Sequence, residues 1–221
     1  MLDVNAAHAA SIAAEIGGVA AVCDITDSAG LTAALDTAAA AHGPARIVMN
    51  IAGIGSARRV VGKDGSPAPL EDFERVVRVN LIGTYNVVRL SAARIAKLEP
   101  LADGERGVML MTASVAAYDG QVGQEAYAAS KGGIVSMTLP LARDLAQHGI
   151  RAVTIAPGLF ETLLMQTLSV EVRQGLAASI PFPRRLGHPD EFAALAAHIV
   201  TNVHLNGETI RLDGALRMAP R

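Results

Sequence analysis

Residues 107–157 read GVMLMTASVAAYDG, then QVGQEAYAASKGGIVSMTLPLARDLAQHG, then IRAVTIAP. The apolar run Val108 to Met111 predicts a strand, and Arg151 to Ala156 predicts a second one. Between them, Glu125 to Gln147 has the length of a helix, and Gly149 is placed to end it. Two strands joined by a helix pair in parallel through a right-handed crossover. This stretch therefore predicts an α/β protein.

The same alternation extends through the rest of the chain. Further strands are predicted at Met1 to Val4, Val19 to Cys23, Arg46 to Asn50 and Glu208 to Leu212. Further helices are predicted at Ala6 to Ile16, Ser28 to Ala41, Leu70 to Leu98, Pro189 to Val200 and, as short pieces, between Glu161 and Ala178. Gly83 is a possible kink in the long helix, and the glycines and prolines of Gly53 to Pro69 indicate an irregular surface loop. The alternation favours a parallel sheet in one domain that spans residues 1–221.

Composition and charge argue against several classes of protein. The chain carries 19 basic and 21 acidic side chains, a net charge of -2, without a basic cluster, so no nucleic acid and no acidic membrane surface is expected as a partner. No charge-free stretch approaches the roughly 18 apolar residues of a membrane-spanning helix. Cys23 has no partner for a disulfide, which favours a reducing compartment and predicts a cytoplasmic protein. The six histidines lack metal-ligand spacing, so no metal site is expected.

One pair of side chains has the spacing of a catalytic unit. Tyr127 and Lys131 are four residues apart in the expected helix, so they lie on one face of it. A phenol has an unperturbed pKa of about 10, and an ammonium beside it favours the phenolate. Ser114, just beyond the strand Val108 to Met111, lies at the edge where ligands collect in parallel sheets. From spacing alone, the alternative stays open that Tyr127 and Lys131 are ordinary surface neighbours and Ser114 is a turn former.

Several motifs occur together in one order along the chain. They are Asn50-Ile-Ala-Gly53 after a strand, Asn80 in Val-Asn-Leu, Ser114, Tyr127-x-x-x-Lys131 and Pro157-Gly158-x-x-x-Thr162. In this combination the sequence resembles the short-chain dehydrogenase/reductases, from Met1 to Arg221. Stretches such as Thr112-Ala-Ser-Val-Ala-Ala and Ala129-Ser-Lys-Gly-Gly-Ile-Val resemble the 3-hydroxyacyl-CoA and hydroxysteroid dehydrogenases of that family. The resemblance implies a Rossmann-like, doubly wound parallel sheet in three layers.

The resemblance also implies an activity and roles for individual residues. The implied reaction interconverts a secondary alcohol and a ketone, with a 3-hydroxyacyl-CoA or a hydroxysteroid as the expected substrate. Tyr127 is then the general acid/base, and Ser114 orients the reacting oxygen. Lys131 binds the nicotinamide ribose and lowers the pKa of Tyr127, while Asn80 supports a proton-relay water. Besides Tyr127 and Lys131, the expected cofactor contacts are Asp3, Asp24, Asn50, Ala52, Gly53, Pro157, Gly158 and Thr162.

The identity of the cofactor follows from one of these contacts. An acidic residue at the position of Asp3 accepts hydrogen bonds from a ribose, and its charge would repel a 2′-phosphate, so NAD is favoured over NADP. Other residues have plain structural readings as well. Asp24 can merely cap a turn, and Pro157-Gly158 can merely end a strand. Arg58, Arg59 and Lys63 could meet the phosphates of a coenzyme A carrier, but a solvated loop is the favoured interpretation.

One element of the family has no counterpart in this sequence. The family opens with a strand, a glycine-rich turn and a helix whose N-terminus binds the cofactor diphosphate, whereas this chain resembles the part that follows them. We therefore expect an N-terminally truncated domain, without the first strand and helix, that binds NAD weakly. The alternative is a catalytically impaired remnant that serves as a scaffold or interaction subunit.

The resemblance further implies a homotetramer. Its subunits would pair through the helices at Leu70 to Leu98 and Glu125 to Gln147. The small and apolar residues Ala129, Gly133 and Met137 are expected on the outer face of the second helix, where they would permit close packing.

Overall fold

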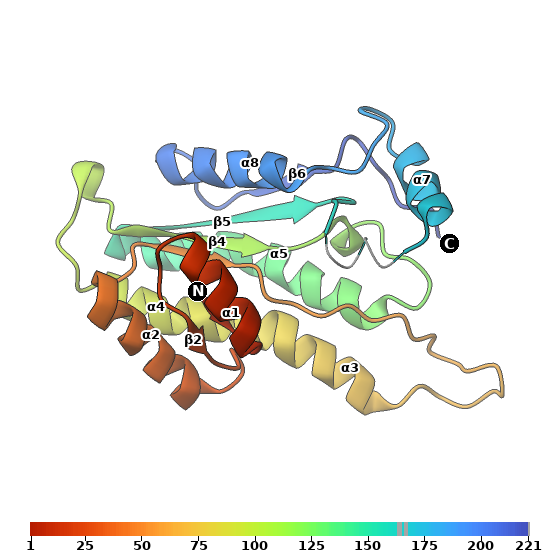
Figure 1. The fold of residues 1–221 in the computed structure, drawn as a ribbon, viewed down its shortest axis with the longest axis horizontal. Coiled ribbons are helices and arrows are strands. Elements are labelled where there is room, and N and C mark those ends of the chain that lie inside the picture. Colours follow the sequence, from red (N-terminus) through yellow and green to blue (C-terminus); the bar gives the residue numbers. More distant parts are fainter. Residues whose placement is uncertain (163–164, 166–167, 221) are drawn as a thin grey trace.

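The strands of this protein form two parallel sheets. The computed structural model describes residues 1–162, 165 and 168–220. The strands are β1 (Leu2–Asp3), β2 (Ala21–Val22), β3 (Ile47–Asn50), β4 (Gly107–Thr112), β5 (Ile150–Pro157) and β6 (Thr209–Leu212). The helices of four or more residues with regular α geometry are α1 (Ala6–Glu15), α2 (Ser28–His42), α3 (Leu70–Val77), α4 (Thr84–Ile95), α5 (Glu125–Leu145), α7 (Val170–Ala178) and α8 (Pro189–Thr201). Neighbouring strands are parallel throughout, which confirms the predicted α/β crossover fold (Figure 1).

The larger sheet, in the order β3–β4–β5–β6, is covered by helices on both faces. Successive side chains of a strand point to opposite faces, and β4 shows the consequence. Met109 and Met111 pack with α4 and α5, whereas Val108 and Leu110 pack with α8. All four side chains are at most 1% exposed. The sheet thus forms the middle of three layers, with α8 above it and α3, α4 and α5 below it in Figure 1.

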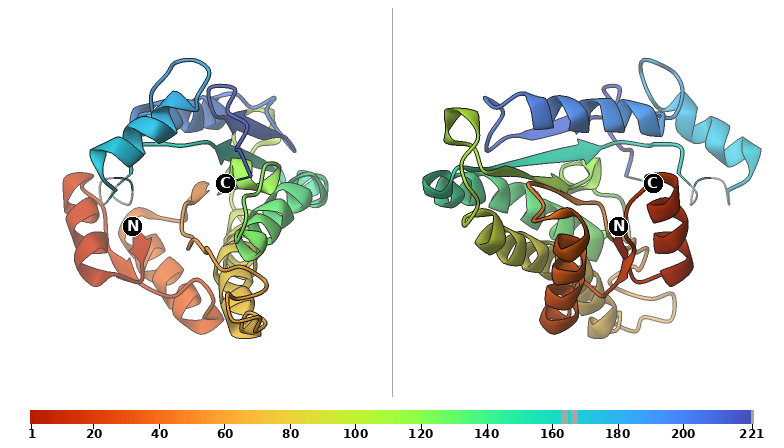
Figure 2. Two further views of the ribbon diagram at one scale, coloured as in Figure 1. Left: turned by 90° about the vertical axis from the view of Figure 1, so that its right-hand side faces the viewer. Right: turned by 60° about the vertical axis from the view of Figure 1, so that its left-hand side comes forward.

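The smaller sheet, β1–β2, is not hydrogen-bonded to β3 in the described part of the chain. It is attached through side chains instead, because Cys23 and Leu31 of the N-terminal region share a buried cluster with Val87 of α4. Figure 2 shows these N-terminal elements, in red and orange, beside the four-stranded sheet rather than within it. Ile47 and Met49 of β3 are accordingly 50% and 45% exposed. The edge of the four-stranded sheet at β3 is therefore not paired with β1–β2 in the described part of the chain.

The long helix expected at Leu70 to Leu98 is interrupted by a π-helical turn, Arg78–Gly83. A Cβ atom on Gly83 would lie 2.7 Å from the Ile25 side chain, so the kink is built where glycine permits close packing against the N-terminal region. Such turns widen a helix by one residue and often mark functional sites. Here the turn contains Asn80, whose side chain is completely buried.

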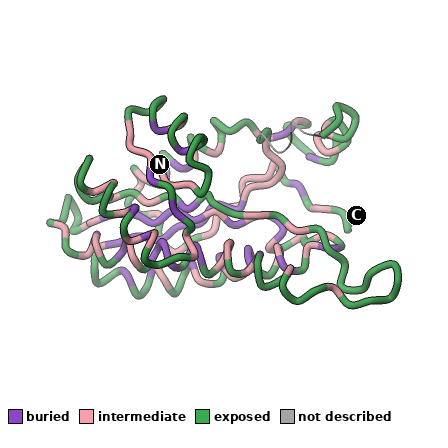
Figure 3. Tube along the Cα trace, turned by 60° about the horizontal axis from the view of Figure 1, so that its bottom comes forward, coloured by how far each residue is buried: buried purple, intermediate pink, exposed green. Residues whose placement is uncertain are grey.

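The loop expected at Gly53 to Pro69 forms a protruding hairpin. An isolated antiparallel bridge joins Val61 to Pro67, and the Gly62 amide donates to the Ser66 carbonyl. Residues 58–67 are all exposed (Figure 3). The prediction of a surface loop is therefore confirmed.

Gly133 does not lie on an outer face as expected. A Cβ atom at this position would lie 2.7 Å from the Leu81 side chain, so the glycine permits close contact between α5 and the π-helical turn of the same chain. Met137 likewise packs against the core cluster beneath α5. Ala129 is exposed and remains available to a neighbouring molecule.

In the described part of the chain, no helix combines the length and the apolar character that a membrane span requires. Within the same residues, no group of three or more His, Cys, Asp or Glu side chains is arranged to hold a metal ion.

Candidate active site

The expected site residues follow strands that end at one edge of the sheet. Asn50 of β3 is in register with Met111 of β4, and Thr112 of β4 is in register with Ile155 of β5. Residues that follow these strands are therefore brought to the same edge, where ligands bind in parallel α/β folds. Ser114 lies two residues beyond β4.

The hydroxyl groups of Ser114 and Tyr127 meet at this edge. Tyr127 lies in the first turn of α5, with its phenol near enough to the Ser114 hydroxyl for that group to influence its pKa. The Ser114 hydroxyl also accepts from the Ala116 amide at 3.1 Å, so it caps a short 3₁₀ turn at the same time. The structural and functional readings of Ser114 are therefore compatible. Burial raises the pKa of Tyr127, and the Ser114 hydroxyl opposes that rise.

Lys131 lies beside the Tyr127 ring and is only 4% exposed. Its Nζ donates to the Thr112 carbonyl at 2.7 Å and lies over the Tyr127 ring, 5.8 Å from the ring centroid. Burial lowers the pKa of Lys131 to about 8. That Lys131 lowers the pKa of Tyr127 stays a prediction; in this structure burial of the phenol is the largest influence on that pKa, and Ser114 is the one that opposes it.

Asn80 fixes the chain beyond β3. Its Oδ1 accepts from the Ile54 amide at 2.8 Å, and its Nδ2 donates to the Ile54 carbonyl at 2.9 Å. The same Nδ2 donates to the hydroxyl of Ser130 at 3.0 Å, and that hydroxyl donates to the Tyr127 carbonyl at 2.8 Å. Ser130 was not predicted as a site residue, although its position between Tyr127 and Lys131 on the same helix indicates that it lies near them.

Gly53 and Asn50 border the same edge of the sheet. A Cβ atom on Gly53 would lie 3.2 Å from Asn80 Oδ1 and 3.5 Å from Lys131 Nζ, so the glycine keeps open the space beside the lysine. Asn50 is 8% exposed, and its Nδ2 has no hydrogen-bond partner in the described part of the chain. Ala52, between these two residues, is exposed. A buried unpaired amide and an open glycine fit a bound polar group at this place.

The turn after β5 holds the next pair of expected contacts. The Gly158 amide donates to the Leu212 carbonyl, and a Cβ atom on Gly158 would lie 2.8 Å from the Asp213 Cβ. The turn therefore both ends the strand and packs tightly on the segment after β6. Thr162, further along, is exposed at the edge of the described residues.

Asp3 and Asp24 belong to the smaller sheet and have local partners. Asp3 Oδ1 accepts from the Asn5 amide at 2.9 Å, and its other oxygen lies 3.5 Å from His8. Asp24 Oδ1 accepts from the Thr26 amide at 2.8 Å, as a turn-capping aspartate does. The structure thus unites Ser114, Tyr127, Lys131, Asn80 and Gly53 directly, and it leaves the two aspartates on a separate element.

The described helix N-termini do not fit a diphosphate. A free N-terminus attracts anions through unpaired amides and the helix dipole. Here α1, α2 and α7 are capped by their own side chains, Asn5, Asp27 and Ser169. Acidic residues occupy the first turns of α3, α5, α7 and α8, namely Glu71, Asp72, Glu125, Glu171, Asp190 and Glu191. Among the described residues, the N-termini of α1, α2, α3, α5, α7 and α8 are therefore capped or acidic and do not attract an anion.

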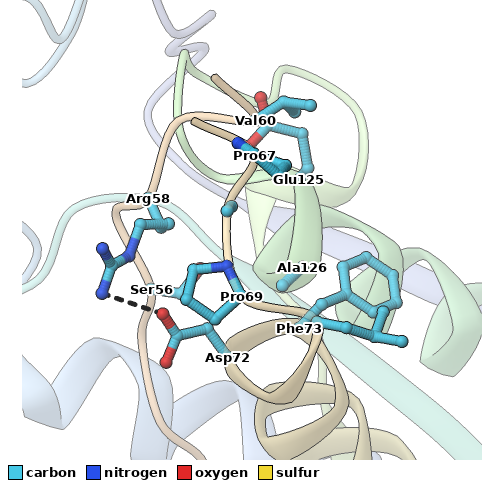
Figure 4. A pocket seen from close by; sticks show the side chains of 11 residues that line it. Ser56, Arg58, Val60, Pro67, Pro69, Asp72, Phe73, Glu125 and Ala126 are labelled. Carbon is cyan, nitrogen blue, oxygen red and sulfur yellow. Dashed lines mark ion pairs between the residues drawn. The ribbon is translucent and has the colours of Figure 1, made fainter. Parts of the chain in front are cut away.

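A separate pocket of about 240 Å³ lies between the hairpin loop and the first turns of α3 and α5 (Figure 4). Its lining is mostly apolar and includes Pro69, Phe73 and Ala126. Arg58 at its rim forms an ion pair with Asp72 at 2.9 Å. That pairing connects Arg58 of the loop to the first turn of α3.

Comparisons with known proteins agree with this geometry. The family described as "Enoyl-(Acyl carrier protein) reductase" matches residues 1–216. A 3-hydroxyacyl-CoA dehydrogenase type-2 of Bos taurus is 55% identical over 201 residues, which is 90% of this chain and 77% of that protein. Among solved structures, a 3-hydroxyacyl-CoA dehydrogenase type-2 from Mycobacterium avium superposes with a TM-score of 0.95 at 45% identity, covering 100% of this chain and 86% of that one.

A third relative carries a cofactor. The 3-ketoacyl-(acyl-carrier-protein) reductase from Brucella melitensis, solved in complex with NADH, gives a TM-score of 0.84 at 31% identity, covering 98% of this chain and 86% of that one. With a parallel sheet flanked by helices and a serine, tyrosine and lysine at its carboxyl edge, the chain belongs to the short-chain dehydrogenase/reductase family. It is a Rossmann-fold member of a family of oxidoreductases.

Proposed function

We propose that this chain is an NAD(H)-dependent oxidoreductase that interconverts a 3-hydroxyacyl-CoA, or a related secondary alcohol such as a hydroxysteroid, with its ketone. The observation that carries the proposal is the neighbouring pair of Ser114 and Tyr127 beside the buried Lys131, whose Nζ lies 5.8 Å from the Tyr127 ring centroid. Similarity to 3-hydroxyacyl-CoA dehydrogenases type-2 supports the substrate class. The single cysteine, Cys23, is buried and free, which suits a reducing compartment such as the cytoplasm.

The roles of the residues follow from their positions. Bound NAD would supply the hydride acceptor at the carbon that carries the substrate hydroxyl. The Ser114 hydroxyl holds the substrate oxygen, and the Tyr127 oxygen takes its proton during oxidation or returns it during reduction. The Lys131 ammonium binds the nicotinamide ribose, while Asn80 and Ser130 hold α5 against the loop after β3. Because burial raises the pKa of Tyr127, the phenol is the dominant form at neutral pH, which favours proton donation and thus ketone reduction.

A substrate panel tests this proposal. Formation of NADH is followed by absorbance with 3-hydroxyacyl-CoA esters of several chain lengths, a hydroxysteroid and a simple secondary alcohol, each with NAD and with NADP. We expect the esters with NAD to give the highest kcat/KM. A preference for NADP would show that Asp3 does not select the cofactor, and inactivity toward every alcohol would favour the scaffold alternative.

We further propose that NAD binds weakly to this chain. The diphosphate needs backbone amides at a helix N-terminus, and the described helix N-termini are capped or acidic. Lys131 lies on α5 beside the larger sheet and Asp3 lies on the smaller sheet, and we identify no diphosphate site that joins them in the described part of the chain. Calorimetric titration is expected to give a Kd above about 1 mM, or a binding free energy weaker than about -4 kcal/mol. Micromolar affinity would show that the amides of some other segment replace this element.

The chain is also expected to assemble into a homotetramer. Phe73, Ile82, Tyr85 and Leu139 on α3, the π-helical turn, α4 and α5 are between 41% and 52% exposed. A hollow of about 310 Å³ between α4 and α5 adds room for a neighbouring side chain. Burial of apolar surface of this kind stabilises association. Light scattering at micromolar concentration is expected to show a tetramer, and a monodisperse monomer would contradict this.

A further inference from the structure

Arg211 joins the end of β6 to the segment that leads from Ser114 to Tyr127. Its guanidinium donates to Asp119 Oδ2 and lies 5.0 Å from the Tyr118 ring centroid. The pair is well shielded, since the side chains of Arg211 and Asp119 are 21% and 17% exposed. Asp119 and Tyr118 belong to residues 115–124, here called the connecting loop. Arg211 therefore contacts the connecting loop in two ways, through an ion pair and through an aromatic ring.

The residues after β6 reinforce these contacts. Arg211 Nε donates to Asp213 at 2.7 Å, and a second arginine, Arg217, donates to the same carboxylate at 3.2 Å. Arg211 also donates to the Leu216 carbonyl at 3.0 Å. Asp213 is 8% exposed and contacts the turn at Gly158, as described above. The network thus reaches the connecting loop on one side and the turn after β5 on the other.

The C-terminal residues also form hydrogen bonds with the connecting loop. The Gln121 side chain donates to the Ala219 carbonyl at 2.9 Å, and the Val122 amide donates to the Pro220 carbonyl at 3.1 Å. The loop contains Gly120 and Gly123, and the latter has a φ of +86°. A glycine-containing loop has many conformations to lose, so contacts from outside it are needed to fix one of them.

We infer that Arg211 is a positioning residue that, through Asp119 and the connecting loop, holds the Ser114 hydroxyl against the Tyr127 hydroxyl. The inference rests on the proposed function only in treating these two hydroxyls as the reacting pair. The alternative is that the network only attaches the C-terminal residues to the domain. The two interpretations predict different results when Arg211 is replaced. The first predicts a weaker contact between the Ser114 and Tyr127 hydroxyls, and the second predicts no change in that contact.

Fluorine NMR of the full chain labelled with 3-fluorotyrosine distinguishes them. The sequence has three tyrosines and no tryptophan, so Tyr85, Tyr118 and Tyr127 each give one resonance, assigned with single Tyr→Phe variants. Ser114→Ala removes the hydroxyl that acts on the Tyr127 phenol and is expected to shift the Tyr127 resonance. In an Arg211→Lys background, we expect this shift to fall by about half or more, because the two changes are coupled. Asp119→Asn is a smaller change and is expected to reduce the shift in the same way. It replaces Arg211→Lys in the experiment if that variant does not fold.

Arg151→Lys is the matched control. Arg151 is a buried arginine at the other end of β5, where it bonds to Glu105 at 2.7 Å and to three carbonyl oxygens. Its loss destabilises the fold without touching the connecting loop, so the effect of Ser114→Ala on Tyr127 is expected to keep its full size. An undiminished effect in the Arg211 and Asp119 variants, or an equal loss in Arg151→Lys, would overturn the inference. The readout needs no turnover, so an inactive chain would contradict the proposed function and not this inference.

Discussion

Replacement of Tyr127 by phenylalanine is expected to lower kcat/KM for oxidation of a 3-hydroxyacyl-CoA by about 10² to 10⁴-fold, the loss typical of a missing general acid/base. Phenylalanine keeps the ring over Lys131 and its packing, while the oxygen that exchanges the proton is removed. The measurement is the initial rate of NADH formation at high NAD concentration. The unfolding transition of the variant should remain close to that of the parent.

Tyr85→Phe is the matched control for this variant. Tyr85 is 50% exposed on α4 and takes no part in the proposed reaction. We expect its turnover to match that of the parent chain. Comparable turnover in Tyr127→Phe would remove Tyr127 from the reaction and with it the assignment of the site.

Replacement of Lys131 by methionine is expected to abolish turnover and yet to stabilise the fold at neutral pH. The ammonium is buried, and burial lowers its pKa from 10.5 to about 8. A shift of this size corresponds to roughly 3 kcal/mol by which the charged lysine destabilises the folded chain. The hydrogen bond to the Thr112 carbonyl is lost in the variant, so the expected net gain is about 2 kcal/mol.

The pH dependence of that gain has a defined sign. Below pH 8 the lysine is charged in both the folded and the unfolded chain, and its full cost is present. Between pH 8 and 10.5 it is neutral only in the folded chain, so the cost disappears as the pH rises. Chemical denaturation should show the stability difference between parent and Lys131→Met shrinking over this range. Lys97→Met, at an exposed position, should change stability by less than about 0.5 kcal/mol, and a destabilised Lys131→Met would contradict the account.

Much of the fold could be predicted because its determinants are local. The continuous apolar run Val108 to Met111 predicts a strand, and the structure divides these residues between two helix layers. The kink at Gly83 was also predicted. Its form as a π-helical turn was not, since it depends on contact with Ile25, which lies far away in the sequence. The outward placement of Gly133 failed for the same reason, because Leu81 occupies the space beside it.

The reacting side chains of the site could be predicted from the sequence. The contacts that hold those side chains in place could not. The spacing of Tyr127 and Lys131 on one helix is a local property, and the position of Ser114 after β4 follows from the topology. The hydrogen bonds that hold these groups in place join residues up to 92 positions apart. They are Lys131 to the Thr112 carbonyl, Asn80 to Ser130, and Arg211 to Asp119. Sequence periodicity carries no information about such pairs. The burial that raises the pKa of Tyr127 cannot be read from the spacing of residues along the sequence.

The transfer of deuterium from substrate to cofactor tests the central claim most directly. The chain is incubated with a 3-hydroxyacyl-CoA that carries deuterium on the hydroxyl-bearing carbon and with NAD at millimolar concentration, and the NADH formed is analysed by mass spectrometry. We predict NADH that contains one deuterium atom, formed by the parent chain and nearly absent with Tyr127→Phe. NADH without deuterium, or none at any NAD concentration, would contradict hydride transfer at this site.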